Sequence, residues 1–191
     1  IEHLFDNGWS VRQKLRYLHT KVKLNQVYAA DWLNETALNR GYSGSDEKMN
    51  AVTLDNQVDG NFDTGAVNHR VLIGMDYQDR SNHTTGYYGS FPAIDAFNPV
   101  YGAGPDDITM YGQEKHKLRQ TGYYLQDQMS WERWRFTLGG RYDQVSVSNI
   151  DKLNQTRSDL DKNNFSTRAA LLYLFDNGFA PYISYSTAFT P

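Results

Sequence analysis

Leu-Phe-Asp-Asn-Gly followed by an aromatic residue occurs twice in this chain, at residues 4–9 and again at residues 174–179. Asp-Asn-Gly tolerates the positive φ angles that a tight hairpin turn requires. Each copy lies between stretches in which apolar and polar residues alternate. The reuse of one turn near both ends of the sequence predicts a chain built from repeated antiparallel hairpins.

Alternation with a period of two recurs along the chain, and helical periodicity is nearly absent. From residue 9 to 21, one parity is mainly aromatic and aliphatic, whereas the other carries Arg12, Lys14 and Arg16. Such a strand suits a wall between lipid and water, or one sheet of a soluble sandwich. The same pattern predicts further strands at residues 49–62, 69–80, 118–131, 134–147, 165–175 and 179–189. The strand at 118–131 is irregular because Asp127 falls on the apolar parity, which a β-bulge or a position near a membrane boundary would explain.

The connections between these strands alternate strictly between short and long. Short turns are expected at residues 6–8, 63–68, 132–133 and 176–178, and long polar loops at 29–47, 84–117 and 148–163. Outer-membrane β-barrels have this arrangement, with short periplasmic turns, long extracellular loops and aromatic girdles. The expected periplasmic girdle consists of Trp9, Trp131, Trp134, Phe175 and Phe179. We therefore predict an all-β fold, an antiparallel transmembrane β-barrel segment.

Composition agrees with this fold class. The 191 residues include no cysteine, 14 tyrosines, 9 phenylalanines and 4 tryptophans, and the net charge is only −3. This charge leaves no electrostatic footprint for nucleic acid. No apolar run is long enough for a transmembrane helix, and a mean hydropathy of −0.69 remains compatible with barrel strands that are apolar only at alternate positions.

Several stretches, in the same order, resemble the TonB-dependent siderophore receptors, most closely the hydroxamate branch that takes ferrichrome and ferrioxamine. They are Trp9–Arg16, Phe97–Val100, Gln120–Gln128, Phe136–Asp143, Tyr173–Gly178 and Pro181–Pro191. The resemblance implies a plugged barrel of about 22 strands in the Gram-negative outer membrane. Residues 1–191 would supply about eight of them, as a partial barrel domain without the plug and the C-terminal strands. It further implies uptake of ferric hydroxamate siderophores, energised by TonB through the missing N-terminal part.

A ferric siderophore arrives with its iron already chelated, so no cofactor and no protein metal ligand are expected. Binding needs a concave aromatic surface with a few hydrogen-bond donors. By position in the family's motif order, Tyr28 matches a strand end that lines the ligand pocket, and Tyr87 and Tyr88 match an aromatic pair in the following loop. Trp32 and Phe91 are the next candidates. The alternatives are the interfacial aromatic belt for Tyr28 and Trp32, and ordinary loop packing for residues 101 and 111.

No catalytic constellation is present in the sequence, and the five histidines have no metal-ligand spacing. We therefore expect no enzyme activity, no catalytic residue and no metal site. Expected partners are the siderophore, TonB, outer-membrane lipid or lipopolysaccharide, and a phage or bacteriocin, but no nucleic acid. Two alternatives stay open: a small structural or adhesion barrel of eight strands, and a TonB-dependent receptor for a different cargo. An outer-membrane barrel enzyme is a third, for which no serine–histidine or carboxylate pair is found.

Overall fold

The computed structural model describes residues 1–189, which form one antiparallel sheet of eight strands in sequential order, β1 to β8. Thr190 and Pro191, which close the last quoted motif, lie outside the described residues. The strands are β1 (Glu2–Leu4), β2 (Ser10–Trp32), β3 (Ala37–Thr64), β4 (Val67–Asp95), β5 (Asp106–Trp131), β6 (Trp134–Asp151), β7 (Thr156–Tyr173) and β8 (Tyr182–Ser186). The predicted all-antiparallel class is confirmed.

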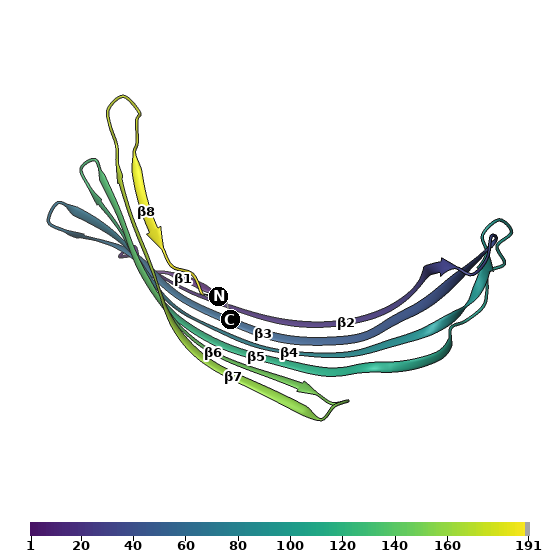
Figure 1. The fold of residues 1–191 in the computed structure, drawn as a ribbon. Coiled ribbons are helices and arrows are strands. Elements are labelled where there is room, and N and C mark those ends of the chain that lie inside the picture. Colours follow the sequence, from purple (N-terminus) through teal and green to yellow (C-terminus); the bar gives the residue numbers. More distant parts are fainter. Residues whose placement is uncertain (190–191) are drawn as a thin grey trace.

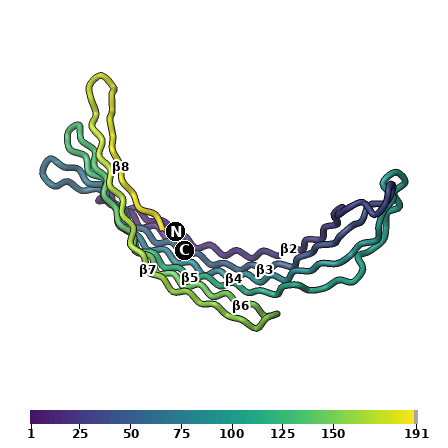
Figure 2. Tube along the Cα trace, viewed as in Figure 1, coloured from purple at the N-terminus to yellow at the C-terminus, as the bar shows by residue number. Residues whose placement is uncertain are grey.

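The sheet is bent along its strands into a trough, and each strand pairs with its neighbour in the sequence (Figure 1). The Cα trace shows one layer only, with no second sheet packed against it (Figure 2). Only four apolar side chains among the described residues are buried: Tyr42, Ala51, Val71 and Val145. The molecule is therefore a wall with two accessible faces. Within residues 1–189, no helix is long and apolar enough to cross a membrane.

The repeated Asp-Asn-Gly turn has the same hydrogen bonds in both copies. In the first, the Gly8 amide donates to the Phe5 carbonyl over 3.1 Å, and the Phe5 amide donates to the Trp9 carbonyl over 2.8 Å. In the second, the Gly178 and Phe175 amides make the equivalent bonds over 3.1 and 2.9 Å. Both glycines have positive φ, 79° and 83°, as the turn requires. The hairpin prediction is confirmed at both places.

The long loops predicted from polar sequence are mostly strand. The connections at this end of the sheet are shorter than predicted and comprise only residues 33–36, 96–105 and 152–155. Strands β3 and β4 are 28 and 29 residues long. A membrane crossing needs only about 9–11 residues of strand. Polar side chains are compatible with a strand whose two faces meet water, so the ladder continues beyond the apolar segment. Loop boundaries placed at the end of the apolar alternation were therefore wrong.

Asp127 lies on the apolar side of β5 without a bulge, because the register with β4 and β6 runs through it unbroken. One of its carboxylate oxygens lies 2.8 Å from Nδ1 of His69, whose ring stacks on Phe62 at 4.8 Å between centroids. Asp127 is four residues from the short turn after Trp131. Of the two predicted explanations, the bulge is wrong, and the position close to the short-turn end of the strand agrees with the structure.

Candidate functional site

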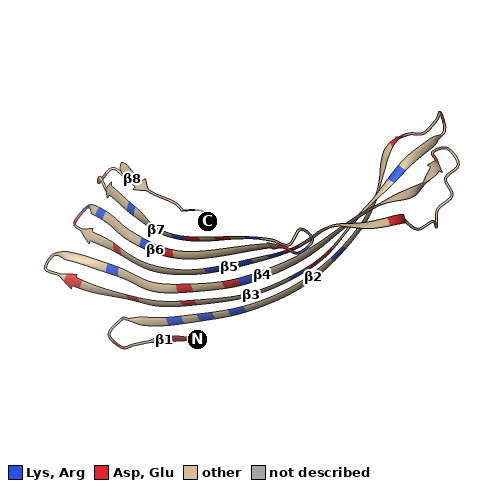
Figure 3. Ribbon diagram, turned by 60° about the horizontal axis from the view of Figure 1, so that its bottom comes forward, with Lys and Arg blue, Asp and Glu red and all other residues tan. Residues whose placement is uncertain are grey.

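The sheet has two faces of different chemistry, which the register assigns strand by strand. One, the polar face, carries Ser10, Arg12, Asp55, Gln57, Asp59, Asp76, Gln120, Tyr124, Arg141 and Asp143. The other, the apolar face, carries Leu15, Tyr17, Val52, Leu54, Ile73, Tyr77, Tyr123, Leu125, Leu138, Tyr142 and Phe165. These apolar residues lie toward the short-turn ends of the strands, and we call them the apolar belt. Basic residues follow one another along β2, whereas acidic residues mark β3 and β4 (Figure 3).

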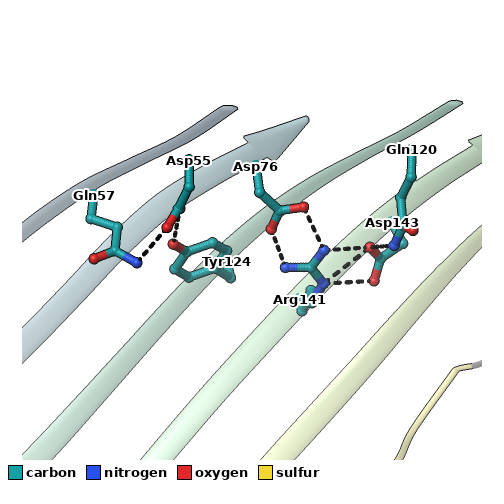
Figure 4. Close-up of polar contacts among 7 residues, drawn as sticks. All are labelled: Asp55, Gln57, Asp76, Gln120, Tyr124, Arg141 and Asp143. Atoms are coloured by element: carbon teal, nitrogen blue, oxygen red, sulfur yellow. Dashed lines mark hydrogen bonds and ion pairs between the residues drawn. The ribbon is translucent and has the colours of Figure 1, made fainter. Parts of the chain in front are cut away.

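Two hydrogen-bonded clusters form a network across the polar face from β3 to β6 (Figure 4), and they meet where the Arg141 guanidinium carbon lies 5.7 Å from the Tyr124 ring centroid. The Tyr124 hydroxyl donates to Asp55 over 2.9 Å. The Arg141 guanidinium donates to Asp76 over 3.0 Å and to Asp143 over 2.8 Å, and Gln120 donates to Asp143 over 2.9 Å. A bidentate guanidinium between two carboxylates restricts all three side chains. The network therefore ties four strands together and leaves Arg141 with no free charge to offer a ligand.

Bulky side chains on both faces lie over a glycine of the neighbouring strand. A Cβ atom on Gly41 would lie 2.5 Å from the Tyr28 ring, and one on Gly86 would lie 2.5 Å from the Tyr111 ring. Trp9 over Gly60 and Tyr124 over Gly74 repeat the arrangement. Because a glycine has no side chain, the ring can lie flat on the sheet. These aromatic-over-glycine pairs fix the direction in which each ring points.

Two of the five predicted ligand-binding residues share the polar face near the end that is remote from the short turns. Tyr28 pairs with Gly41, Gly41 pairs with Ser90, and Tyr88 is two residues before Ser90 on the same side of β4. Both side chains are accessible, at 44% and 53% exposure. Tyr87, as the neighbour of Tyr88 in a strand, points to the opposite face.

The other two candidates do not join this pair. Phe91 pairs with Arg40, whose guanidinium carbon lies 4.7 Å from the ring centroid, on the same side of the sheet as Tyr87. Trp32 pairs with Leu38 beyond an irregularity in the β2–β3 ladder and is 56% exposed at the tip of the hairpin. The structure thus brings together Tyr28 and Tyr88 but not Tyr87, Phe91 or Trp32.

Tyr111 is an additional member that sequence reasoning assigned to loop packing. Its ring lies over Gly86 on the polar face, and its centroid is 6.1 Å from that of Tyr88. Residue 111 was placed inside a long loop, where side-chain direction cannot be inferred. A regular period of two would have put it on the opposite face, with Lys115 and Lys117; the irregularity between Gly86 and Tyr87 in the β4–β5 ladder brings it to the Tyr88 side. We call Tyr28, Tyr88 and Tyr111 the tyrosine site.

The polar face below the tyrosine site carries ionisable groups. Glu47 and Glu114 lie there, on β3 and β5. His116 lies between Asn149, 2.7 Å from Nδ1, and Glu114, 2.9 Å from Nε2. The hydrogen bond with Asn149 raises the pKa of His116 above 6.5, and Glu114 adds to this effect against the opposing effect of partial burial. Across residues 1–189, no group of three or more His, Cys, Asp or Glu side chains is arranged to hold a metal ion.

Comparison with known proteins identifies the family to which this sheet belongs. Residues 1–191, the whole chain, match the family model described as TonB dependent receptor-like, beta-barrel. This chain belongs to the TonB-dependent receptor barrels. Barrels of this family are Gram-negative outer-membrane proteins, so the apolar belt of this receptor segment faces lipid and its polar face lines the lumen. The predicted fold and localisation are confirmed, and the small adhesion barrel is set aside.

The relatives of this receptor barrel segment are receptors and transporters. It is 85% identical over its full length to the ferrioxamine B receptor of Salmonella typhimurium (strain LT2), 27% of which it covers. It is 37% identical to the ferrioxamine receptor of Yersinia enterocolitica and 32% identical to the ferrichrome outer membrane transporter/phage receptor of Escherichia coli K12, covering 28% and 29% of them. The chain thus spans little more than a quarter of these curated relatives.

Solved structures share the fold of this segment. The FpvAI–pyocin S2 complex superposes with a TM-score of 0.84 at 19% identity, over 97% of this chain and 25% of that one. The open form of the ferric-catecholate import receptor Fiu from E. coli K12 gives a TM-score of 0.82 at 15% identity, over 100% of this chain and 34% of that one. At such identities the likeness establishes the fold alone.

Proposed function

We propose that this segment is part of the wall of an outer-membrane receptor that takes up ferric hydroxamate siderophores, with ferrioxamine B as the first candidate. The 85% identity to a ferrioxamine B receptor over all 191 residues carries this proposal. Transport would be energised through TonB, contacted by a part of the receptor outside this segment. The iron would arrive already chelated, so the protein would need neither a metal ligand nor a catalytic step.

Within this wall, we place the siderophore contact at the tyrosine site. Three exposed tyrosines on the lumen face offer flat apolar surface together with hydroxyl donors, which suits a compact chelate coated with carbonyl and methylene groups. Glu47 and Glu114, deeper on the same face, favour a ligand whose net charge is zero or positive. Tyr87, Phe91 and Trp32 face elsewhere, so their contribution to binding should be smaller.

The test compares neighbouring tyrosines in the full-length receptor that carries this segment. Tyr28→Ala and Tyr88→Ala should each weaken binding of ferric ferrioxamine B about tenfold, which corresponds to about 1.4 kcal/mol. Tyr87→Ala, one residue away on the opposite face, is the matched control and should stay within about twofold of the unmodified receptor. Binding is measured by tryptophan fluorescence of purified receptor, and uptake by growth of an iron-starved, receptor-deficient strain.

Equal loss in Tyr87→Ala and Tyr88→Ala, at normal surface expression, would contradict the tyrosine site. Absence of growth on any hydroxamate siderophore, even with the unmodified receptor, would instead contradict the proposal that the cargo is a ferric hydroxamate. A phage or bacteriocin could also dock on the hairpins that project beyond the apolar belt. The 32% identity to a ferrichrome outer membrane transporter/phage receptor motivates that proposal, and loss of phage infection or bacteriocin killing in a strain that lacks the receptor would test it.

A further inference from the structure

Two glutamates flank a threonine on the lumen face, just below the tyrosine site. Glu47 of β3 is the register partner of Thr84 in β4, and Thr84 is the partner of Glu114 in β5. Gly86, which lies under the Tyr111 ring, is two residues beyond Thr84 on the same face. Because two residues of a strand span about 7 Å, one small ligand can contact the tyrosine rings and both glutamates at the same time.

Each of the two glutamates keeps one carboxylate oxygen available. Oε1 of Glu47 accepts a hydrogen bond from the Ser45 hydroxyl over 3.2 Å. Oε2 of Glu114 lies 2.9 Å from Nε2 of His116, and the Glu114 side chain is 51% exposed. The second oxygen of each has no hydrogen-bond partner within residues 1–189. Asp151, the register partner of Glu114, differs because its carboxylate accepts backbone amides of its own turn.

The lumen face carries no basic side chain of lysine or arginine at this height. On the described strands β2 to β5, the residues of the lumen face between the level of Thr20 and that of Tyr28 include neither type. The nearest lumen cation on β4 is Arg80, four residues below Thr84. The lysines of the same stretch alternate onto the opposite face and point away from the lumen. The local potential therefore favours a cationic ligand and disfavours an anionic one.

Aromatic rings beside carboxylates suit one chemical group in particular, an organic ammonium ion. The face of an aromatic ring attracts a cation, and a carboxylate supplies both the opposite charge and a hydrogen-bond acceptor. Tyr88 and Tyr111, with ring centroids 6.1 Å apart, provide the aromatic part directly above the two glutamates. A ferric chelate coated with carbonyl and methylene groups can use the rings and hydroxyls but has no donor for a carboxylate. The glutamates therefore indicate a second ligand group, a protonated amine.

We propose that Glu47 and Glu114 determine specificity, by selecting siderophores that carry a primary ammonium group on a flexible chain. The ferric trihydroxamate rests on the tyrosine site, while its ammonium group reaches the space above Thr84 and binds both carboxylates. Ferrioxamine B, a linear trihydroxamate that ends in an amine, has this chemistry. The inference rests on the proposed function, because it assigns the charge preference of the same site.

The test separates the charge of the ligand from its chelate, in the full-length receptor that carries this segment. Binding of ferric ferrioxamine B is compared with binding of its N-acetylated derivative, which keeps the chelate but has no charged amine. The unmodified receptor should bind ferrioxamine B about tenfold more tightly, and added salt should reduce this difference. Glu47→Gln/Glu114→Gln should abolish the preference by weakening the binding of ferrioxamine B alone. Unchanged binding of the N-acetylated derivative shows that the double variant is folded.

The matched control is Asp46→Asn/Asp79→Asn, which removes the same charge from the opposite face of β3 and β4 and should keep the full preference. Equal affinity of the unmodified receptor for the two chelates would overturn the inference. Equal weakening of both chelates in the glutamate variant, or loss of the preference in the control, would overturn it as well. Failure of the unmodified receptor to bind either chelate would instead contradict the proposed function, and the inference with it.

Discussion

Single residues on opposite faces of this wall have opposite electrostatic environments. His83 and His116 lie on adjacent strands beyond the apolar belt. His83 lies beside Lys48 and Lys115 on the same side of the sheet as the apolar belt, and His116 lies on the lumen face. Burial and Lys115 lower the pKa of His83, whereas the hydrogen bond that His116 donates to Asn149 Oδ1 and the contact with Glu114 raise the pKa of His116. Both pKa shifts are caused by residues on neighbouring strands that the register brings beside each histidine. Measuring the two pKa values therefore tests which face of the sheet each histidine occupies.

We predict that NMR titration of labelled histidines will find the two pKa values on opposite sides of 6.5. Below 6.5, down to the folded-state pKa of His83, the unfolded chain binds more protons at that residue, so its contribution to stability rises with pH. Above 6.5, up to the folded-state pKa of His116, the folded chain binds more protons there, so its contribution falls with pH. Asn149→Ala should lower only the pKa of His116, and Lys115→Gln should raise mainly that of His83. Identical titration of both rings would contradict the face assignment.

At the scale of strands and hairpins, the main difference from the sequence-based prediction is that the strands stay paired beyond the apolar belt. Residues 84–95 and 106–117 were predicted to be loop and are paired strand, with irregularities near Gly86 and Tyr88. Hydrogen exchange of the full-length receptor should therefore show slow amides in these two segments and fast ones in residues 96–105. Exchange of residues 84–95 as fast as that of 96–105 would show that the ladder does not persist.

The reason for this departure is physical. Alternation located the strands wherever one face meets lipid, and the Asp-Asn-Gly turns fixed two hairpins. Beyond the apolar belt both faces meet water, so alternation vanishes although pairing continues. For the same reason, sequence alone could not predict the whole tyrosine site. Tyr28 could be selected from its place in a family motif. The opposite directions of Tyr87 and Tyr88, and the inclusion of Tyr111, could be assigned only from the strand register.

At the scale of the whole segment, residues 1–189 form a sheet with β1 and β8 as its edge strands and a single layer of side chains on each face. Unpaired backbone groups at such edges recruit other strands. We predict that the 191-residue segment, expressed alone, will be polydisperse in detergent and aggregate in water. The full-length receptor in the same detergent should run as one species. Analytical ultracentrifugation of both proteins distinguishes these outcomes, and a monodisperse monomeric segment in water would contradict the prediction.

The aromatic-over-glycine pairs limit which sequences can descend from this one. Gly41 cannot acquire a side chain while Tyr28 keeps its ring in place, and the same holds for Gly86 with Tyr111. The glycine of each pair can therefore acquire a side chain only once its tyrosine has changed, although the two residues lie 13 and 25 positions apart. A lineage that adapts to a differently shaped cargo by replacing one of these tyrosines releases its glycine from constraint. Substituted glycines in descendant sequences should therefore mark the lineages in which the lumen surface has been rebuilt.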